Sequence, residues 1–345
     1  MNLNGRMKYI FFQFFLIISI CSFSGCKGQP TFGENYLQLI KTISLPNVKG
    51  RIDHLDINLK DQIIYISALH NGTVEVIDLK NGKVIHTITG LDEPQGISYI
   101  PQQHEIFVAN GGNGKCYFYN ANTFLKVATI QLNSDADDVR YDSIERKIYV
   151  GYGSGGIAII DADKYKQLAN IKLPAHPEGF EIDKKNHLLY VNLPGSNMTG
   201  IVDLNQLKLV NKWTRTTPTG NFPMALDTTG NKLFIGYRHP AKLVVMNTKT
   251  GKQLSITDMA NDADDLFYDE NAKRVYVSCG GGYTRLGYIN IFQFQGINTY
   301  KQIANIPTRN GSRTSLLIPE LKLFIVPEES VFSHDGELMI YKISN

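Results

Sequence analysis

Residues 135–173 read DADDVRYDSIERKIYVGYGSGGIAIIDADKYKQLANIKL, and the rest of the chain repeats this pattern. Polar turns alternate with four short segments rich in β-branched and aromatic residues, which predicts four antiparallel strands. We expect these strands at residues 139–141, 147–151, 156–161 and 167–173. Four strands in about 40 residues are typical of one blade of a β-propeller.

An aromatic residue between aliphatic ones marks the second strand of every repeat. The seven aromatics are Tyr65, Phe107, Tyr149, Tyr190, Phe234, Tyr276 and Phe324, at spacings of 42, 42, 41, 44, 42 and 48 residues. An aromatic flanked by aliphatic residues suits a strand that is buried between two blades. A β-sandwich would not explain the even spacing. The sequence therefore predicts an all-β fold, a seven-bladed β-propeller of four-stranded antiparallel blades over residues 36–345.

The two ends of the repeat predict how the ring closes. The seventh repeat lacks a fourth strand, whereas residues 36–45 (YLQLIKTISL) form an extra strand before the first repeat. This extra strand is similar to the fourth strands elsewhere, such as KVATIQL. We expect the N-terminal strand to complete the last blade, because this pairing removes the open sheet edges of a split repeat.

The first 25 residues predict a lipoprotein signal peptide that is not part of the fold. Arg6 and Lys8 precede an apolar run, 9–23, that is too short to span a bilayer comfortably. The following Phe23-Ser-Gly-Cys26 resembles the bacterial lipobox. The resemblance implies lipid attachment to Cys26, a tether over 26–35, and a place in the bacterial cell envelope facing the periplasm or the cell surface. The alternative is an ordinary secretory signal with an incidental cysteine.

Charge and cysteine content argue against nucleic-acid binding and against a disulfide. The formal net charge of the 345 residues is +3, and Arg6 and Lys8 carry two of these charges. No basic run appears, which argues against nucleic acid as a partner. Cys116 and Cys279 are expected on opposite sides of the ring, too far apart for a disulfide. We interpret both as packing residues, and the chain as a single-domain monomer.

The repeat motifs also resemble a known family. The markers IYV, LYV and VYV, together with GTVEVIDLKNGKVIHTI at 72–88, resemble the YVTN-repeat β-propellers, the YncE-like proteins, over residues 36–343. The resemblance implies an exported, seven-bladed protein from a family mostly without an assigned reaction. Some of its members are proposed to bind nucleic acid or partner proteins. These motifs are core residues, so they indicate a fold rather than a function.

Counting back from the marker aromatics predicts a polar ring at one mouth of the central channel, where the loops enter the innermost strands. Twelve residues back lie Asp53, Gln95, Asp137, Glu178, Phe222 and Asp264, and the seventh repeat offers Arg313 or Thr314. Fourteen residues back lie Arg51, Glu93, Asp135, His176, Gly220 and Asp262. The predicted ligand-binding residues are Arg51, Asp53, Gln95, Asp135, Asp137, Arg140, His176, Glu178, Asp262, Asp264, Arg238 and Arg313.

Two of the loops are near copies, Asp135-Ala-Asp-Asp138 and Asp262-Ala-Asp-Asp265, and their six carboxylates are expected to converge from nearly opposite sides of the ring. Crowded carboxylates repel one another, and their pKa values rise unless cations balance them. The candidate balancing residues are Arg51, Arg140, Arg238 and Arg313. A divalent cation such as calcium is the other solution, with Asp137, Asp264, Glu178 and His176 as candidate ligands. A third interpretation is that these aspartates only cap their own turns.

Two histidines on the same rim are candidates for acid–base catalysis. His54 follows Asp53, and His176 lies two residues before Glu178. Histidine titrates near neutrality, so either pair suits proton transfer, although each histidine equally suits a hydrogen bond to its own loop. No motif of an activated nucleophile appears.

Three functions remain open at this point. The first is an extracytoplasmic binding or scaffold propeller whose polar funnel face recognises a small ligand, a peptide or a partner protein. The second is a lactonase-type hydrolase that depends on a divalent metal at the channel mouth. The third is a structural protein of the envelope. The irregular loop 327–336 in the seventh repeat is a further place where specificity could be added.

Overall fold

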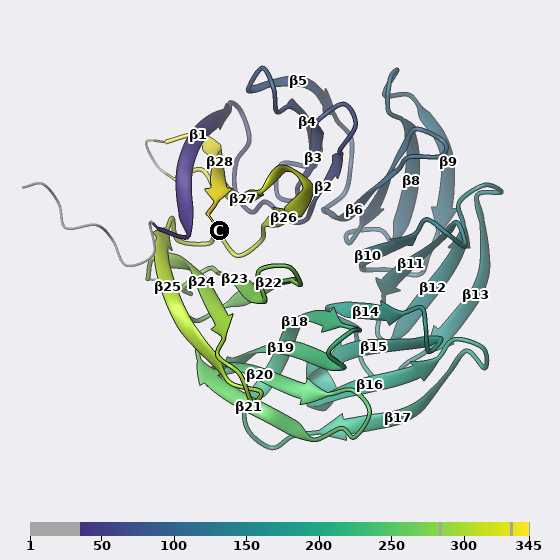
Figure 1. The fold of residues 1–345 in the computed structure, drawn as a ribbon. Helices are drawn as coiled ribbons and strands as arrows, with labels where there is room; N and C mark the ends of the chain where they lie inside the picture. The colour runs from purple at the N-terminus through teal and green to yellow at the C-terminus, as the bar shows by residue number, and fades with distance from the viewer. Residues whose placement is uncertain (1–34, 283–284, 332–333, 345) are drawn as a thin grey trace, which may run out of the picture. The chain divides into compact units, whose positions relative to one another are not determined.

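The seven predicted blades are all present in the computed structural model, which describes residues 35–282, 285–331 and 334–344. Each is a four-stranded antiparallel sheet, and the sheets follow one another around a ring (Figure 1). The predicted signal peptide and Cys26 lie outside the described residues. No described helix is long and apolar enough to cross a bilayer.

The first four blades follow one another along the chain without interruption. Blade one holds β2 (Leu55–Asn58), β3 (Ile63–Ala68), β4 (Thr73–Asp78) and β5 (Lys83–Ile88); blade two holds β6 (Pro94–Ile100), β7 (Glu105–Asn110), β8 (Lys115–Asn120) and β9 (Lys126–Gln131). Blade three holds β10 (Ala136–Asp142), β11 (Lys147–Tyr152), β12 (Gly156–Asp161) and β13 (Lys166–Lys172). Blade four holds β14 (Phe180–Asp183), β15 (Leu188–Leu193), the 3-10 turn η1 (Pro194–Ser196), β16 (Met198–Asp203) and β17 (Lys208–Thr214).

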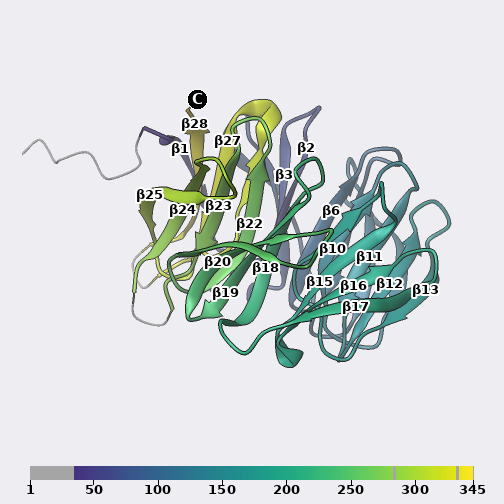
Figure 2. The same cartoon turned by 60° about the horizontal axis from the view of Figure 1, so that its bottom comes forward.

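Blade five holds β18 (Thr219–Asp227), β19 (Lys232–His239), β20 (Ala241–Asn247) and β21 (Gln253–Asp258); blade six holds β22 (Ala263–Asp269), β23 (Arg274–Cys279), β24 (Gly287–Phe294) and β25 (Tyr300–Thr308). Blade seven holds β26 (Leu316–Ile318), the 3-10 turn η2 (Pro319–Leu321), β27 (Leu323–Glu328), β28 (Gly336–Ile343) and β1 (Leu37–Leu45). In the tilted view of Figure 2, β11, β12 and β13 lie side by side in chain order, as the strands of the first six blades do.

The ring closes as predicted. β1 pairs antiparallel with β28, from Leu37 opposite Ile343 to Leu45 opposite Gly336. In Figure 1 the purple N-terminal strand therefore lies beside the yellow C-terminal one. Because the first and last strands of the chain share one sheet, no blade is left with three strands, and opening the ring requires breaking this ladder.

The core lies between the blades, where the marker aromatics are buried. All seven lie on the second strand of their blade, and none is more than 3% exposed. Tyr276 of blade six stacks on Phe324 of blade seven with ring centroids 5.4 Å apart. Burying an aromatic side chain stabilises a fold by about 1.5–3 kcal/mol, so these seven residues contribute substantially to the packing between blades. Cys116 and Cys279 are buried free thiols, as predicted.

Close approach of neighbouring innermost strands constrains the channel wall. A Cβ on Gly96 of β6 would lie 2.0 Å from the carbonyl oxygen of Asp137 in β10. Only glycine permits this contact, which brings β10 of blade three against β6 of blade two. Backbone packing between these blades thus helps to position the side chains that enter the channel.

Candidate functional site

A central cavity of about 1420 Å³ is lined by residues of all seven blades. The innermost strands β2, β6, β10, β14, β18, β22 and β26 surround it. Its volume exceeds the roughly 300–1,000 Å³ of ordinary small-molecule pockets. The cavity can hold a ligand of several residues or a smaller molecule with water.

A repeated loop geometry places the polar ring at one mouth of this cavity. The residue fourteen before the marker adopts left-handed backbone in blades two, three and six, with φ of 52° at Glu93, 46° at Asp135 and 64° at Asp262. Aspartate tolerates this conformation better than most residues. The carbonyl of each accepts a hydrogen bond from the glycine that follows the second strand, namely Gly111, Gly153 and Gly280, at 2.8, 3.1 and 2.8 Å.

A β-bulge then turns two consecutive side chains into the cavity. The register between the first and second strands shifts from Ala136 to Val139 in blade three, and from Ala263 to Asp265 in blade six. A regular strand would send alternate side chains to opposite faces, whereas a bulge re-aims one of them. Asp137 and Asp138 therefore both line the cavity, and so do Asp264 and Asp265.

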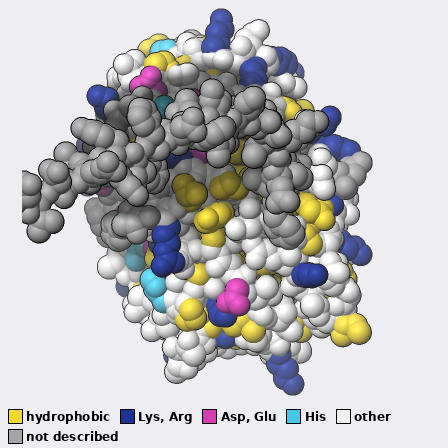
Figure 3. All heavy atoms as spheres, turned by 90° about the vertical axis from the view of Figure 1, so that its left-hand side faces the viewer, with side chains coloured by type: hydrophobic (Ala, Val, Ile, Leu, Met, Phe, Trp, Pro, Cys, Tyr) yellow, Lys and Arg dark blue, Asp and Glu magenta, His cyan; other side chains and the backbone are white. Residues whose placement is uncertain are grey.

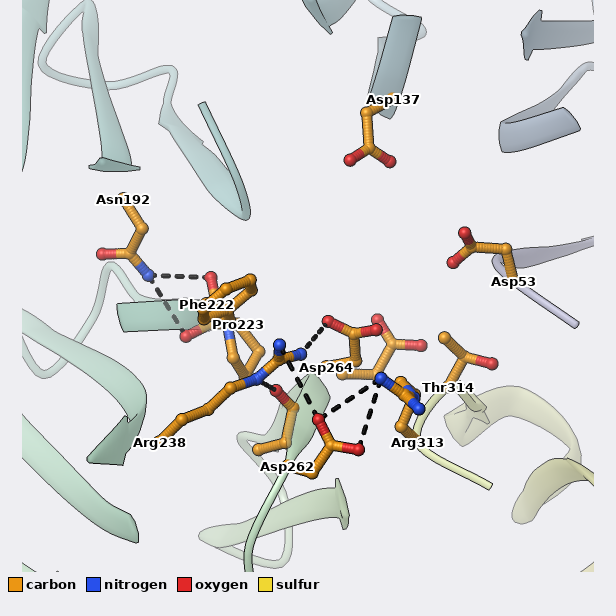
Figure 4. Close-up of polar contacts among 12 residues, drawn as sticks. Asp53, Asp137, Asn192, Phe222, Pro223, Arg238, Asp262, Asp264, Arg313 and Thr314 are labelled. Carbon is orange, nitrogen blue, oxygen red and sulfur yellow. Dashed lines mark hydrogen bonds and ion pairs between the residues drawn. The ribbon is translucent and has the colours of Figure 1, made fainter. Parts of the chain in front are cut away.

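The predicted site residues fall into two groups. Those that line the cavity are Arg51, Asp53, His54, Asp137, Arg140, Glu178 and Asp264. Those that lie behind them and contact ring residues are Gln95, Asp135, His176, Asp262, Arg238 and Arg313. Asp53 and Asp137 point toward one shared space in Figure 4, and Asp264 enters it from the side of blade six.

Arginines neutralise the ring on the side of blade six. Arg238 Nη2 lies 2.6 Å from Asp264 Oδ1, and Arg313 Nη1 lies 3.3 Å from Asp262 Oδ2 (Figure 4). Arg51 Nη2 lies 3.4 Å from Asp264 Oδ2. The guanidinium of Arg238 also sits 3.5 Å from the ring centroid of Phe222, and its Nε donates to the carbonyl of Ala263 at 2.9 Å. These contacts fix Arg238 as a structural counterion.

Histidines are the counterions on the side of blade three. His176 Nε2 lies 3.6 Å from Asp137 Oδ2, and its Nδ1 lies 2.6 Å from the carbonyl oxygen of Gly153. Burial lowers the pKa of His176, but the hydrogen bond to Asp137 and the contact with Gly153 outweigh it and raise this pKa to about 9. His176 is therefore protonated at neutral pH and holds the pKa of Asp137 below its ordinary value against the effect of burial.

His54 lies between the Asp-Ala-Asp-Asp motifs of blades three and six. Its Nε2 lies 4.0 Å from Asp137 Oδ1, and its Nδ1 lies 3.5 Å from Asp265 Oδ1. Burial would lower the pKa of His54, but the carboxylates of Asp265 and Asp53 hold it well above the ordinary value. A histidine that stays protonated at neutral pH acts here as a cation rather than as a general base.

Two carboxylates of the ring remain short of partners. Asp53 is 1% exposed, and neither of its oxygens accepts a hydrogen bond from a described residue, although Arg51 Nη2 lies 3.1 Å away. Burial raises the pKa of Asp53 to about 6. Within the described residues, the side chain of Glu178 has no hydrogen bond or ion pair, and burial together with Asp137 and Asp264 raises its pKa to about 8.

A second polar level lies deeper in the channel. Arg140, predicted at the mouth, contacts Asp138 and lies 3.6 Å from Glu181 Oε1. Asp56 and Glu181 lie three residues after Asp53 and Glu178 and also line the cavity. Neither was among the predicted site residues. Asp56 and Glu181 lie on β2 and β14, whereas Asp53 and Glu178 precede these strands. The signal that could have identified them is the recurrence of an acid three residues after a ring acid in two blades.

The metal and acid–base candidates can be located as well. Among the residues with described positions, no three His, Cys, Asp or Glu side chains are grouped closely enough to hold a metal ion. Of the predicted ligands, Asp137 and Glu178 line the cavity and His176 contacts Asp137, whereas Asp264 is engaged by Arg238 and Arg51. The proposed pair of His54 and Asp53 is 3.8 Å apart.

Comparison with known proteins supports the fold. No family model matches the chain, and no curated protein matches it either. A chain in the crystal structure of the mitotic checkpoint complex matches 99% of this chain over 100% of its own length, with a TM-score of 0.75 at 14% identity. A chain of hydrazine synthase from Kuenenia stuttgartiensis matches 88% of this chain over 98% of its own length, with a TM-score of 0.70 at 14% identity. At this identity the likeness concerns the propeller fold alone.

Proposed function

We propose that this protein is an extracytoplasmic binding propeller that recognises a ligand at the carboxylate-rich mouth of its central channel. The observation that carries the proposal is a large cavity whose polar wall is not internally balanced. Asp53 is buried without a hydrogen bond from a described residue, and Glu178 has neither hydrogen bond nor ion pair among them. Unsatisfied buried polar groups cost about 1–3 kcal/mol each, a cost that a ligand can offset.

The location rests on the sequence. The basic start, the apolar run 9–23 and the Phe23-Ser-Gly-Cys26 motif favour export and lipid attachment at Cys26. Acyl chains would hold the propeller at a membrane surface of the bacterial envelope. There it would bind a small molecule, a peptide or an envelope protein.

The geometry gives less support to the lactonase-type alternative. Asp264 is already held by Arg238 at 2.6 Å, which withdraws it from a ligand set with Asp137 and Glu178. Metal ligands in hydrolases converge on one point with an open position. Melting the protein with and without chelator checks this alternative: a stoichiometric divalent ion whose removal lowers the melting temperature would favour the hydrolase.

A ligand screen tests the proposal. The purified full-length protein would be screened by thermal melting and native mass spectrometry against small metabolites and short peptides. A channel ligand should raise the melting temperature of the wild type and fail to do so in the double variant Asp137→Asn, Glu178→Gln. Glu270→Gln is the matched control, because Glu270 is exposed and does not line the cavity.

Two results would overturn the proposal. One is a complete screen in which no compound of any charge stabilises the protein. The other is ligands that bind the double variant as well as the wild type, since such ligands would lie outside the channel.

A further inference from the structure

Resting on the proposed function, we infer that the channel ligand carries an amine or guanidinium cation, bound between Asp137 and Glu178 in the field of Asp53. The inference names the chemical class of the ligand. It follows from the charge of the cavity wall, from the uneven distribution of counterions around it, and from the buried carboxylate beneath the mouth.

The wall of the cavity carries an excess of negative charge. Nine carboxylates line it against three side chains with a fixed positive charge. The carboxylates belong to Asp53, Asp56, Asp61, Asp137, Asp138, Glu178, Glu181, Asp264 and Asp265, and the cations to Arg51, Lys60 and Arg140. The excess remains when His54 and His176 are counted as protonated, when Arg238 is added as the counterion of Asp264, and when Glu178, with a pKa of about 8, is counted as neutral. A cleft lined by one sign of charge concentrates ligands of the opposite sign.

The chain as a whole does not share this excess. On the described part of the face in Figure 3, Lys and Arg side chains are scattered, with few acids among them. The whole chain is slightly basic, with a net charge of +3. A slightly basic protein that gathers its acids in one cavity favours a cationic ligand there over nonspecific attraction.

The counterions leave one part of the mouth open. Arg238, Arg313 and Arg51 engage Asp262 and Asp264, so an anion at this side would have to displace a carboxylate. On the other side, His176 engages Asp137, and Glu178 has no hydrogen bond or ion pair among the described residues, although the charges of His176 and Arg238 act on its pKa. Both carboxylates line the cavity, and burial, followed by repulsion from Asp137 and Asp264, raises the pKa of Glu178. A cation placed between them relieves this repulsion.

Asp53 supplies an independent observation. Its carboxylate lines the cavity, is 1% exposed, and accepts no hydrogen bond from a described residue. Its counterions are Arg51 at 3.1 Å and His54 at 3.8 Å, but Arg51 is shared with Asp264 and His54 with Asp265. A buried carboxylate whose counterions are shared with other acids strengthens the field that a ligand cation meets.

The aromatic part of the wall indicates what the cation is attached to. Tyr99, Tyr141, Phe267 and Tyr268 also line the cavity. Aromatic faces attract cations and accommodate apolar stems. The cavity thus suits a cation with an apolar or aromatic extension, either a free amine or an arginine or lysine side chain of an extended polypeptide.

Calorimetry with matched probes tests the inference. The probes are agmatine, the tripeptide acetyl-Phe-Arg-Phe-amide, and its twin with citrulline, a neutral isostere of arginine. We expect the arginine peptide, agmatine or both to bind the wild type. The arginine peptide should bind at least about tenfold more tightly than the citrulline twin, which corresponds to about 1.4 kcal/mol. Binding should weaken with added salt.

The same experiment tests variants of the site and distinguishes a free amine from a polypeptide as the source of the cation. The single variant Glu178→Gln and the double variant Asp137→Asn, Glu178→Gln should each lose the arginine preference, while Glu270→Gln keeps it. Unfolding curves confirm that each variant is folded, and the single variant keeps the test valid if the double variant is not. Binding of agmatine indicates a free amine, and binding of the peptide alone indicates a polypeptide.

The experiment distinguishes failure of the cation assignment from failure of the proposed binding function. Equal affinity for the arginine and citrulline peptides, or a screen that yields only neutral or anionic channel ligands, overturns the cation and leaves the binding function standing. No channel ligand of any charge overturns both.

Discussion

Blades three and six carry the same four residues at the same place and differ in what surrounds them. Asp135-Ala-Asp-Asp138 and Asp262-Ala-Asp-Asp265 share the left-handed first residue, the hydrogen bond from a glycine, and the bulge. The second aspartate is paired with Arg238 in blade six and with His176 in blade three. The local sequence determines the geometry of the motif, and side chains from other blades determine its ionisation.

The difference divides the channel mouth into a permanent half and a titrating half. Arginine stays charged at every pH at which the protein is folded, so the blade-six motif is always neutralised. The histidine and glutamate near blade three have pKa values of about 9 and 8. Ligands and protons therefore compete beside His176 and Glu178, whereas arginines neutralise Asp262 and Asp264.

The largest expected effect comes from removing the central arginine of the permanent half. Arg238→Ala leaves Asp264 and Asp262 buried with less compensation, and we expect a loss of about 3 kcal/mol in the free energy of unfolding. Urea unfolding measures it. Arg146→Ala is the comparison, because Arg146 and Asp163 form an exposed pair whose loss costs at most about 1 kcal/mol. Equal losses in the two variants would contradict the structural role of Arg238.

Removing the histidine of the titrating half should have a smaller effect that depends on pH. The folded pKa of His176, about 9, lies above the unfolded value of 6.5, so its contribution is full below pH 6.5 and is lost as the pH rises through 9. We expect His176→Asn to cost about 1–2 kcal/mol at pH 6, allowing for solvent screening, and almost nothing at pH 10.

Urea unfolding at several pH values measures this profile, and Arg313→Asn in blade six is the control. Because arginine does not titrate in this range, the cost of the Arg313 variant should not fall between pH 6 and pH 10. A His176 variant whose cost is equally independent of pH would remove the distinction between the two halves.

Neutralising Glu178 should give the smallest effect, with the opposite sign. Its folded pKa of about 8 lies above the ordinary value of 4.5, so the folded protein holds a proton that the unfolded chain releases, and stability falls as the pH rises from 4.5 through 8. Glu178→Gln removes this penalty. We expect the variant to be about 1 kcal/mol more stable than the wild type at pH 9 and no more stable at pH 4. Thermal melting across this range measures the difference, and destabilisation at pH 9 would indicate a structural role for Glu178.

Much of the fold follows from the sequence because the core repeats. The marker aromatics at nearly constant spacing place seven second strands, and the spare strand at 36–45 indicates the closure, both as observed. Counting back twelve residues from Tyr149 or Tyr276 also reaches side chains that line the cavity, Asp137 and Asp264. A fixed offset works because each blade repeats the same turn before its innermost strand.

The sequence was less informative about which side chains meet. A fixed offset cannot show the bulges that bring Asp138 and Asp265 into the cavity beside their neighbours. Nor does the repeat show that Arg51 of blade one reaches Asp264 of blade six. That pairing depends on how the side chains cross the channel, which involves residues 213 positions apart in the chain.

The most direct test of a cation at the titrating half is to count the protons released when the cationic probe binds, whether this probe is agmatine or the arginine peptide. Calorimetry at pH 7 in buffers of different ionisation enthalpy gives this number. If the cation sits beside Glu178, it lowers the pKa of this protonated carboxyl, and about 0.5–1 proton should be released per ligand, with much less in Glu178→Gln. Binding with no proton exchange would place the cation away from the titrating half and contradict its assignment to Asp137 and Glu178.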